Sequence, residues 1–548
     1  MVQRANDTRR LFSAARTAPV SQPLPSTQTQ YRFLYLAVFT AGMTTLGVEF
    51  AASRLLGSIY GSSNIVWANI IGLILIYLTI GYFIGGRWAD RSPYYTTFYR
   101  LIAWAAFLSG MVPLVAHPIL TAAARAVQDF DAALTVGSFV SVLVLFSLPI
   151  TLLGCVSPFS IRLALSDVQK AGGVSGRMYA ISTLGSIIGT FSPVLLLIPQ
   201  LGTARTFLFF AGILLAVGLT GLALHDRRAA LKLAWMPLAL VAGAIVALRP
   251  PIRPAPEGMT LRFEDESAYN LIQVVEDGNG YRYLLLNEGQ GVHSQWHPDQ
   301  LYYRRTWGFF LAGPYFNAPP YTPDRMKRIA IIGLAAGTIA RQHEAVYPGL
   351  PMDGIEIDPG IVEAGRRYMG MTQPGLRVIA EDGRFALNRL EHTYTMIGID
   401  AYRVPYVPWH LTTVEFFEEV RARLDEDGVL IMNVGRTSAD RRLIEALTGT
   451  LYQVFPSVHT LDVPNSYNTI LVATAQPTAP ENLAANLAAL PPDAHPILRE
   501  ALADAVAAIR PTVVGKPVLT DDHAPVESIV DSMVIEFLLG GGLSEFTN

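Results

Sequence analysis

The sequence contains one cysteine, Cys155, in 548 residues. A single cysteine cannot form an internal disulfide, which excludes a disulfide scaffold and a cysteine-based zinc site. Charged residues are also scarce at 16%, where soluble domains carry about 25%. The 41 basic and 44 acidic residues leave a formal net charge of −3, so the chain has no excess positive charge with which to hold nucleic acid. These deficits argue against a soluble or fibrous protein and indicate a membrane protein with a soluble part.

Long apolar runs are abundant, but only in the first half of the chain. A helix that crosses the hydrocarbon core needs about 20 mostly apolar residues. Seven segments reach or approach that length, the last being the shortest: 33–53, 65–85, 101–121, 134–156, 179–199, 204–224 and 231–248. We predict a multi-pass α-helical membrane domain of about seven helices over 31–248, after a disordered basic tail over 1–30.

The positions of lysine and arginine predict how this bundle is oriented, because they mark the cytoplasmic side. With the N-terminus in the cytoplasm, the outer segments hold only Arg54, Arg125 and Arg205. The inner segments after the first span hold Arg87, Arg91, Arg100, Arg162, Lys170, Arg177, Arg227, Arg228 and Lys232. We therefore expect a cell-membrane protein with a cytoplasmic N-terminus.

Glu49 and Arg54 stand near the end of the first span. A carboxylate inside a membrane is costly and is a functional hypothesis by default. The simpler alternative is an interfacial Glu49/Arg54 pair that anchors the helix end.

The second half of the chain has the composition of a soluble α/β protein. A Pro-rich linker over 249–258 precedes a stretch of alternating strands, which predicts a small β domain over 259–315. Over 326–475, strands alternate with helices, which predicts a mostly parallel, doubly wound sheet. A C-terminal helical extension over 476–548 follows.

Acidic residues stand at the carboxyl ends of consecutive predicted strands, where such sheets bind ligands. The glycine turn with Gly333 and Gly337 follows the first strand, and Glu356 ends the second about 20 residues later. Asp382-Gly383 follows the third strand, and Asp400 ends the fourth. This arrangement predicts a nucleoside-containing ligand; the alternative is that the acids merely cap helices.

Several of these segments resemble one family. Glu266-Ser267-Ala268-Tyr269, IIGLAAGTIARQ (331–342), GIEIDPGIV (354–362), EDG (381–383) and IDAYRVP (399–405) resemble motifs of the polyamine (spermidine/spermine) synthases, which are aminopropyltransferases. The whole chain resembles the group in which such a domain is fused behind a membrane bundle. The resemblance implies a Rossmann-like, methyltransferase-type sheet of seven strands preceded by a small β domain.

The resemblance also implies the chemistry and the residues that carry it. An amine would attack the carbon beside the sulfonium of decarboxylated S-adenosylmethionine, releasing methylthioadenosine, and a carboxylate would accept the amine's proton. Asp400 matches the family's catalytic aspartate. The other roles would fall to nucleoside-binding residues Gly333, Gly337, Glu356, Asp382 and Gly383 and to substrate contacts Tyr269, Asn270, Tyr303 and Tyr402. No metal is expected.

The sequence departs from the family at positions that face the acceptor. The family's acid in the glycine turn is replaced by Ala336, and a second acid in the catalytic loop by Arg403. Arg304-Arg305 stands where a His or Gln and a Glu are usual, and Ser294 where a glutamine is usual. A diamine carries two positive charges, so we expect putrescine to bind poorly beside these arginines. The alternative is that Arg403 or Arg304 faces solvent or pairs with Glu381.

One further motif, LTDDHAPVE (519–527), resembles a closing motif of the membrane-fused group. Its acids could return to the mouth of the pocket in place of those lost, or they could cap a helix. His523 beside two aspartates is one histidine without a second at ligand spacing, which does not indicate a metal site.

Three hypotheses remain open. The first is aminopropyl transfer to a small-molecule amine, and the second is another transfer from S-adenosylmethionine, such as methylation, to a different acceptor. The third is a catalytically inactive nucleoside-binding domain that regulates a transport or assembly bundle. The expected partners are the acceptor and the lipid bilayer, and an oligomer is compatible with the sequence. Seven spans place the soluble half outside, away from the cytosolic donor, unless 231–248 re-enters or lies in the interface.

Overall fold

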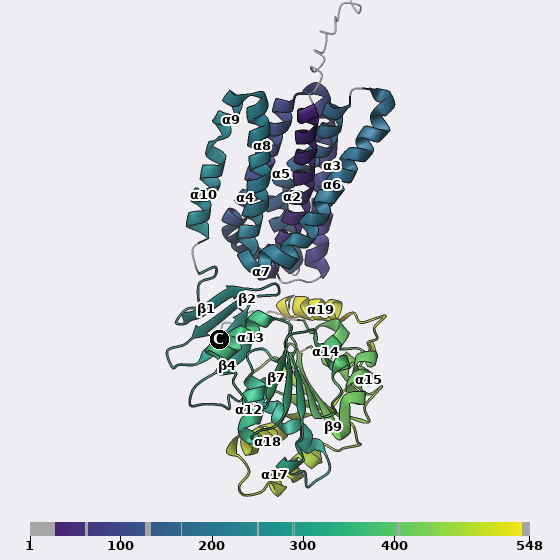
Figure 1. Cartoon of the computed structure of the whole chain (residues 1–548). Coiled ribbons are helices and arrows are strands. Elements are labelled where there is room, and N and C mark those ends of the chain that lie inside the picture. The colour runs from purple at the N-terminus through teal and green to yellow at the C-terminus, as the bar shows by residue number, and fades with distance from the viewer. Residues whose placement is uncertain are drawn as a thin grey trace, which may run out of the picture.

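The computed structural model describes residues 28–60, 64–126, 133–165, 167–248, 251–287, 289, 291–402, 406–438 and 440–539. They form two stacked parts: a bundle of long helices and, at one end of it, an α/β part (Figure 1). The predicted fold class, an α-helical bundle followed by a small β domain and a Rossmann-like sheet, is confirmed.

Seven stretches of helix in the described residues are long and apolar enough to cross a membrane. The bundle helices are α2 (Gln28–Tyr60), α3 (Asn64–Arg91), α4 (Tyr95–Ala126), α5 (Ala133–Ala164), α6 (Ala171–Ser192), α7 (Ile198–Leu201), α8 (Thr203–His225), α9 (Arg227–Leu233) and α10 (Trp235–Ala247). A π-helical turn, η2 (Pro193–Leu197), joins α6 to α7. The last predicted span is broken at Ala234, and α9 and α10 together run the height of the bundle beside α4 and α8 (Figure 1).

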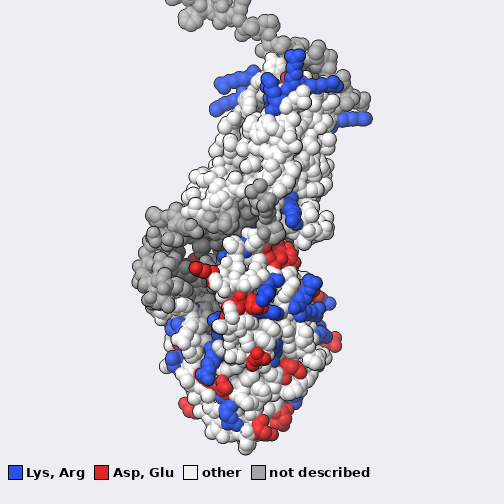
Figure 2. Space-filling model, turned by 90° about the vertical axis from the view of Figure 1, so that its left-hand side faces the viewer, with Lys and Arg blue, Asp and Glu red and all other residues white. Residues whose placement is uncertain are grey.

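The bundle has one basic end. Lysine and arginine side chains gather at the end away from the α/β part, and few are seen at the junction (Figure 2). The α3–α4, α5–α6 and α8–α9 connections meet at this basic end. Two ion pairs lie there, Arg162–Asp90 at 3.2 Å and Arg100–Asp226 at 3.6 Å.

The helices α2 and α6 approach so closely that glycine is required between them. A Cβ built on Gly185 of α6 would overlap the carbonyl oxygen of Phe39, and one on Gly42 of α2 would overlap that of Ser182. Ser186 adds a hydrogen bond of 3.2 Å from its hydroxyl to the Gly42 carbonyl. Small residues that let helix backbones meet are the usual basis of packing in membranes.

The small β domain is a four-stranded antiparallel sheet in the order β1-β2-β3-β4. Its strands are β1 (Thr260–Glu266), β2 (Leu271–Glu276), β3 (Arg282–Leu286) and β4 (Val292–Trp296). The turn between β1 and β2 lies against the helical bundle, and Ile272 and Val274 of β2 pack on Ile361 of the following domain.

The larger sheet has eight strands in the order β12-β10-β11-β9-β8-β5-β6-β7. The parallel strands are β5 (Ile329–Ile332), β6 (Met352–Ile355), β7 (Leu376–Ile379), β8 (Tyr394–Ile399) and β9 (Leu424–Gly435). Antiparallel β11 (Asn468–Thr474), β10 (Ser457–Asp462) and β12 (Ile509–Arg510) complete one edge. The expected count of seven was therefore one short, because the two-residue β12 joins from the C-terminal extension.

Helices cover both faces of this sheet. They are α12 (Thr338–Val346), α13 (Pro359–Tyr368), α14 (Gly383–Arg389), α15 (Val414–Arg423), α16 (Arg442–Leu451), α17 (Glu481–Ala489), α18 (Pro496–Ala508) and α19 (Val526–Leu539). Leu483 of α17 and Leu502 of α18 are fully buried in the core on one face of the sheet. The C-terminal extension is therefore part of the domain's core.

The α2–α6 contact yields a stability prediction. Gly185→Ala should lower the free energy of unfolding by about 1–3 kcal/mol, because the new methyl group meets a backbone oxygen that cannot move aside. Thermal unfolding of the detergent-solubilised chain measures the effect. Gly176→Ala, on the same helix with nothing within 4 Å of the added Cβ, is the control and should be neutral or slightly stabilising. Equal midpoints for the two variants would contradict the packing described.

Candidate active site

A cavity of about 660 Å³ lies between the α/β part and the helical bundle. Its floor comes from the carboxyl ends of β5, β6 and β8 and from the turn after β7, where Gly333, Glu356, Asp382, Gly383 and Asp400 line it. Its roof comes from the bundle: Phe50, Ser53, Arg54 and Gly57 of α2, Trp67 of α3, Val194 of η2 and Ile198 of α7. The four α2 residues are spaced as one face of a helix. The volume is that of a site for a small organic ligand.

The glycine turn after β5 brings the backbone close to the end of the neighbouring strand β8. Gly333 has a φ of +85°, and a Cβ there would lie 2.5 Å from the Asp400 carbonyl group, so only glycine fits. Gly337 has a φ of +82° and precedes α12, but its neighbour is Met371 and it is not part of the cavity lining. Gly333 thus shapes the site directly, whereas Gly337 shapes the turn.

Glu356 is held at the end of β6 by backbone amides. Ala335 donates to its Oε2 at 2.9 Å and Asp358 to its Oε1 at 3.1 Å. Burial raises the pKa of Glu356 to about 7, although these amides act in the opposite direction. A carboxylate so placed can accept hydrogen bonds from the hydroxyls of a ribose.

Asp382 lines the cavity and also caps α14. Its Oδ1 accepts from the backbone amides of Arg384 at 3.1 Å and Phe385 at 3.0 Å. Its Oδ2 lies 3.0 Å from Nε2 of His410, which also lines the cavity. The two roles considered from the sequence, ligand contact and helix cap, are thus compatible in this one residue.

Asp400 follows β8 at the floor of the cavity. Asn433 of β9 donates to its Oδ1 at 2.8 Å, Asn468 of β11 donates to the Asn433 side chain at 2.8 Å, and the Trp307 side chain also hydrogen-bonds Asp400. Burial raises the pKa of Asp400 to about 7 despite these donors. A carboxyl group with this pKa can accept a proton near neutral pH. The sequence did not reveal Trp307, Asn433 or Asn468, which are distant along the chain.

The region that holds Glu356, Asp382 and Asp400 is similar to known proteins. Residues 317–483 match the family model of the spermine/spermidine synthase domain. This stretch is similar to that family, and the α/β part that contains it is called the synthase domain below. It is 33% identical over 220 residues to a probable polyamine aminopropyl transferase of Bifidobacterium longum, covering 39% of this chain and 47% of that protein. It is 34% identical over 159 residues to a polyamine aminopropyltransferase of Vibrio vulnificus, covering 28% and 50%.

The chain spans about half the length of these two curated relatives, and more than half of its own length is unmatched by either. A crystal structure of a probable spermidine synthase from Corynebacterium glutamicum aligns with 49% of this chain and 99% of its own, at 18% identity and a TM-score of 0.37.

The structure corrects one of the expected substrate contacts in the synthase domain. Tyr269, Asn270 and Tyr402 line the cavity, but Tyr303 does not. The Tyr303 hydroxyl accepts from the His297 amide at 3.1 Å and donates to the Gln300 carbonyl at 2.9 Å. Tyr303 therefore stabilises the loop after β4 and lies outside the cavity lining.

The β4 strand instead supplies His293, which sequence reasoning missed. His293 lines the cavity, and burial lowers its pKa to about 4, so the ring is neutral at pH 7. Its neighbour Ser294 is fully buried and accepts a hydrogen bond of 3.0 Å from the Ala336 amide. Strand alternation, which sends neighbouring side chains to opposite faces, could have suggested His293.

The arginines that the sequence places against a cationic acceptor do not all lie near the cavity. Arg304 does not line the cavity; it pairs with Glu500 at 3.4 Å and Asp504 at 3.3 Å on α18. Glu381 pairs with Arg389 at 2.9 Å rather than with Arg304. Arg304 therefore gives no reason to expect weak binding of putrescine. Arg403 lies outside the described residues. Ala336 is fully buried and removes an acid without filling the cavity.

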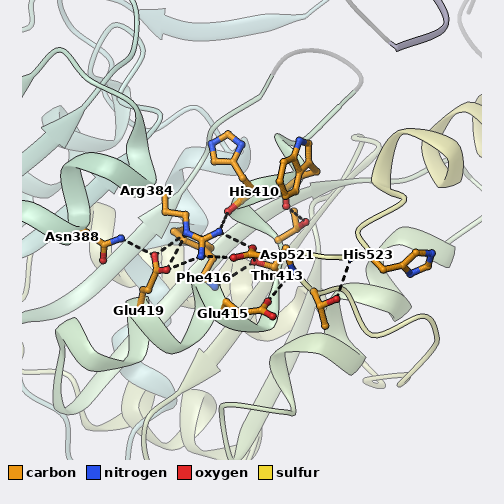
Figure 3. Close-up of polar contacts among 12 residues, drawn as sticks. Arg384, Asn388, His410, Thr413, Glu415, Phe416, Glu419, Asp521 and His523 are labelled. Atoms are coloured by element: carbon orange, nitrogen blue, oxygen red, sulfur yellow. Dashed lines mark hydrogen bonds and ion pairs between the residues drawn. The ribbon is translucent and has the colours of Figure 1, made fainter.

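The C-terminal motif is divided between two roles. Figure 3 shows Arg384 between Glu419 and Asp521. The Arg384 guanidinium donates to the two carboxylate oxygens of Asp521 at 2.7 and 2.8 Å. The Thr413 hydroxyl also donates to Asp521, at 2.7 Å. Asp521 therefore fastens the motif to α14 and α15. Glu527, in the first turn of α19, is the acid of this motif that lines the cavity.

A reciprocal clamp joins the synthase domain to the bundle. Arg54 of α2 donates to the backbone carbonyls of Tyr269 at 2.6 Å and Ser267 at 2.8 Å, rather than pairing with Glu49 as one interpretation of the sequence suggested. Glu266 accepts from the Thr203 amide at 3.0 Å and from its hydroxyl, and thereby caps α8. Acceptors at a helix N-terminus satisfy free amides and favour the helix dipole.

The clamped turn also reaches the nucleoside side of the cavity. The Ser267 hydroxyl donates to Oδ2 of Asp358 at 2.6 Å, and the Asn270 amide nitrogen donates to the same oxygen at 2.8 Å. Asp358 in turn donates its backbone amide to Glu356. Arg54 is thus three hydrogen-bonded links away from the Glu356 carboxylate, which lines the cavity.

Glu356 yields a prediction about pH. Because its pKa is raised, the carboxylate gains charge as the pH rises through about 7, so methylthioadenosine should bind more tightly at pH 8 than at pH 6. Glu356→Gln should weaken binding about ten- to a hundredfold and remove most of this dependence. Calorimetric titration of the full chain measures both. An Asp400→Asn control should keep the pH dependence, and its loss in that variant would assign the titration to Asp400 instead.

Proposed function

We propose that the chain is a membrane-anchored aminopropyltransferase that acts on an amine. In the reaction, the acceptor nitrogen forms a bond to the terminal carbon of the aminopropyl group of decarboxylated S-adenosylmethionine. The bond from that carbon to sulfur breaks, its electron pair stays on sulfur, and the neutral thioether methylthioadenosine leaves. The new ammonium group passes its extra proton to Asp400.

The observation that carries this proposal is the position of Asp400 in the same cavity as Glu356 and Asp382. Glu356 can bind the ribose and Asp382 can accept from the adenine, which directs the sulfonium toward the end of β8. Asp400 is fixed there by Asn433 and carries a raised pKa because it is buried. The match to the synthase domain supports the same assignment.

Replacing Asp400 tests the catalytic role. Asp400→Asn should lower methylthioadenosine release by about 10²–10⁴-fold, the range usual for a lost general base, while nucleoside affinity changes little. In the unsubstituted chain, kcat/KM should rise with pH through about 7 and level off above it, as the carboxylate loses its proton. Glu500→Gln, at an exposed acid outside the cavity, is the control. Similar rates for Asp400→Asn and Glu500→Gln would contradict the assignment.

A second candidate, methyl transfer from S-adenosylmethionine to another acceptor, is favoured by Ala336. The resemblance implies an acid at this position of the glycine turn, and without it the chain offers one carboxylate fewer to orient an ammonium group. Titration with decarboxylated and intact S-adenosylmethionine separates the two candidates, because tighter binding of the intact donor favours methylation. Nucleoside binding without turnover of any acceptor would favour a regulatory domain.

We further propose that the synthase domain lies on the non-cytoplasmic side of the cell membrane. The support is the basic end of the bundle, which is the end remote from the domain (Figure 2), together with the tendency of basic loops to stay in the cytoplasm. The combined length of α9 and α10 supports a seventh crossing over a re-entrant segment. The donor would then have to be available outside the cytosol.

Cysteine labelling tests this orientation. In a Cys155→Ser background, Pro254→Cys should react with a membrane-impermeant maleimide in intact cells, since Pro254 is exposed at the junction. Val168→Cys, 81% exposed at the basic end, is the matched control and should react only after permeabilisation. The reverse pattern would place the domain in the cytoplasm.

A further inference from the structure

Most of the acidic side chains that line the cavity already have a partner or an assigned role other than binding an acceptor amine. Among the described residues, Glu356 and Asp382 face the nucleoside, and Glu381 pairs with Arg389. Glu266 caps α8, and Glu527 is engaged within the protein. Asp400 is therefore the acid best placed to meet an acceptor amine. A second ammonium group on the same acceptor would lack a carboxylate of its own.

The roof of the cavity has a different chemistry from its floor. The side chains that the bundle contributes are mostly apolar: Phe50, Trp67, Val194 and Ile198. Phe50 and Trp67 contact each other edge to face, with ring centroids 6.4 Å apart. In the described part of the bundle, Arg54 is the charged residue of this lining. A cation near the roof would lose water and meet a like charge, both of which are unfavourable.

We propose that the acceptor is an amphiphilic primary amine, with its nitrogen toward Asp400 and its apolar chain against the bundle roof. This rests on the proposed function and defines its substrate class. The bundle would then determine specificity in addition to anchoring the domain. The bond changes are those given above, with the acceptor nitrogen carried by an apolar chain.

The residue that tests the roof most cleanly is Gly57. It lines the cavity, and a Cβ built on it meets nothing within 4 Å, so a larger side chain would fill empty space without displacing a neighbour. Gly57→Leu should therefore shorten the acceptor site and leave the nucleoside site intact. Gly72→Leu is the matched control, because Gly72 of α3 also has open space around its Cβ but lies outside the cavity lining.

The experiment measures methylthioadenosine release by the full chain with putrescine and with butylamine, hexylamine and octylamine. Putrescine and butylamine match in length and differ in the second ammonium group. We expect butylamine to exceed putrescine in kcat/KM at least tenfold, and each further buried methylene to add about fourfold. Gly57→Leu should abolish the gain for hexylamine and octylamine, and Gly72→Leu should preserve it. Methylthioadenosine should bind both variants equally.

Two results would overturn the inference in distinguishable ways. A preference for putrescine over butylamine, or equal chain-length dependence in the two glycine variants, would refute the amphiphilic acceptor and leave aminopropyl transfer standing. Absence of release with every amine, despite nucleoside binding, would refute the proposed function and the inference together.

A second arm identifies the source of the amine. Proteoliposomes of phosphatidylethanolamine or of phosphatidylcholine, incubated with the donor, would be examined by mass spectrometry for an added aminopropyl group. Modified phosphatidylethanolamine would support a lipid headgroup as acceptor. Modification of added octylamine alone would support a free amphiphile. Modification of neither would overturn the inference.

Discussion

The clamp between Arg54 and the turn after β1 is the interaction on which the rest of the site depends. Arg54 binds two carbonyls of this turn, and Glu266, at its start, caps the bundle helix α8. The bundle thus supplies donors to the carbonyls of the turn, and the turn supplies an acceptor to the first amide of α8. Hydrogen bonds with a charged member are stronger than neutral ones. The clamp holds the strand ends of the synthase domain against the bundle, so that one cavity has walls from both.

Burial accounts for the electrostatics of the site. Removing a carboxylate from water disfavours its charge, and burial is the main cause of the raised pKa of both Glu356 and Asp400. The same turn positions Glu356 through Asp358. Side chains of the bundle line the same cavity as these two carboxylates.

Much of the fold could be predicted from the sequence, because it rests on local periodicity. Apolar runs revealed the seven long apolar helices, and alternating strands and helices revealed the parallel sheet with Glu356, Asp382 and Asp400 near its strand ends. Strand β10, which lies between β12 and β11, was missed because its sequence, SVHTLD, is mostly polar. Tyr303 was misplaced because a motif match does not tell which way a side chain points. The roof was missed because Arg54 and Tyr269 are 215 positions apart, and no local pattern connects them.

The central claim is that the bundle and the synthase domain enclose one ligand site. An electron cryomicroscopy structure of the full chain with methylthioadenosine tests it most directly. The account predicts the ribose at Glu356, the sulfur facing Asp400, and the remaining space bounded by Phe50 and Trp67. A nucleoside bound elsewhere, or a synthase domain separated from α2 with Arg54 no longer on the Ser267 and Tyr269 carbonyls, would contradict it.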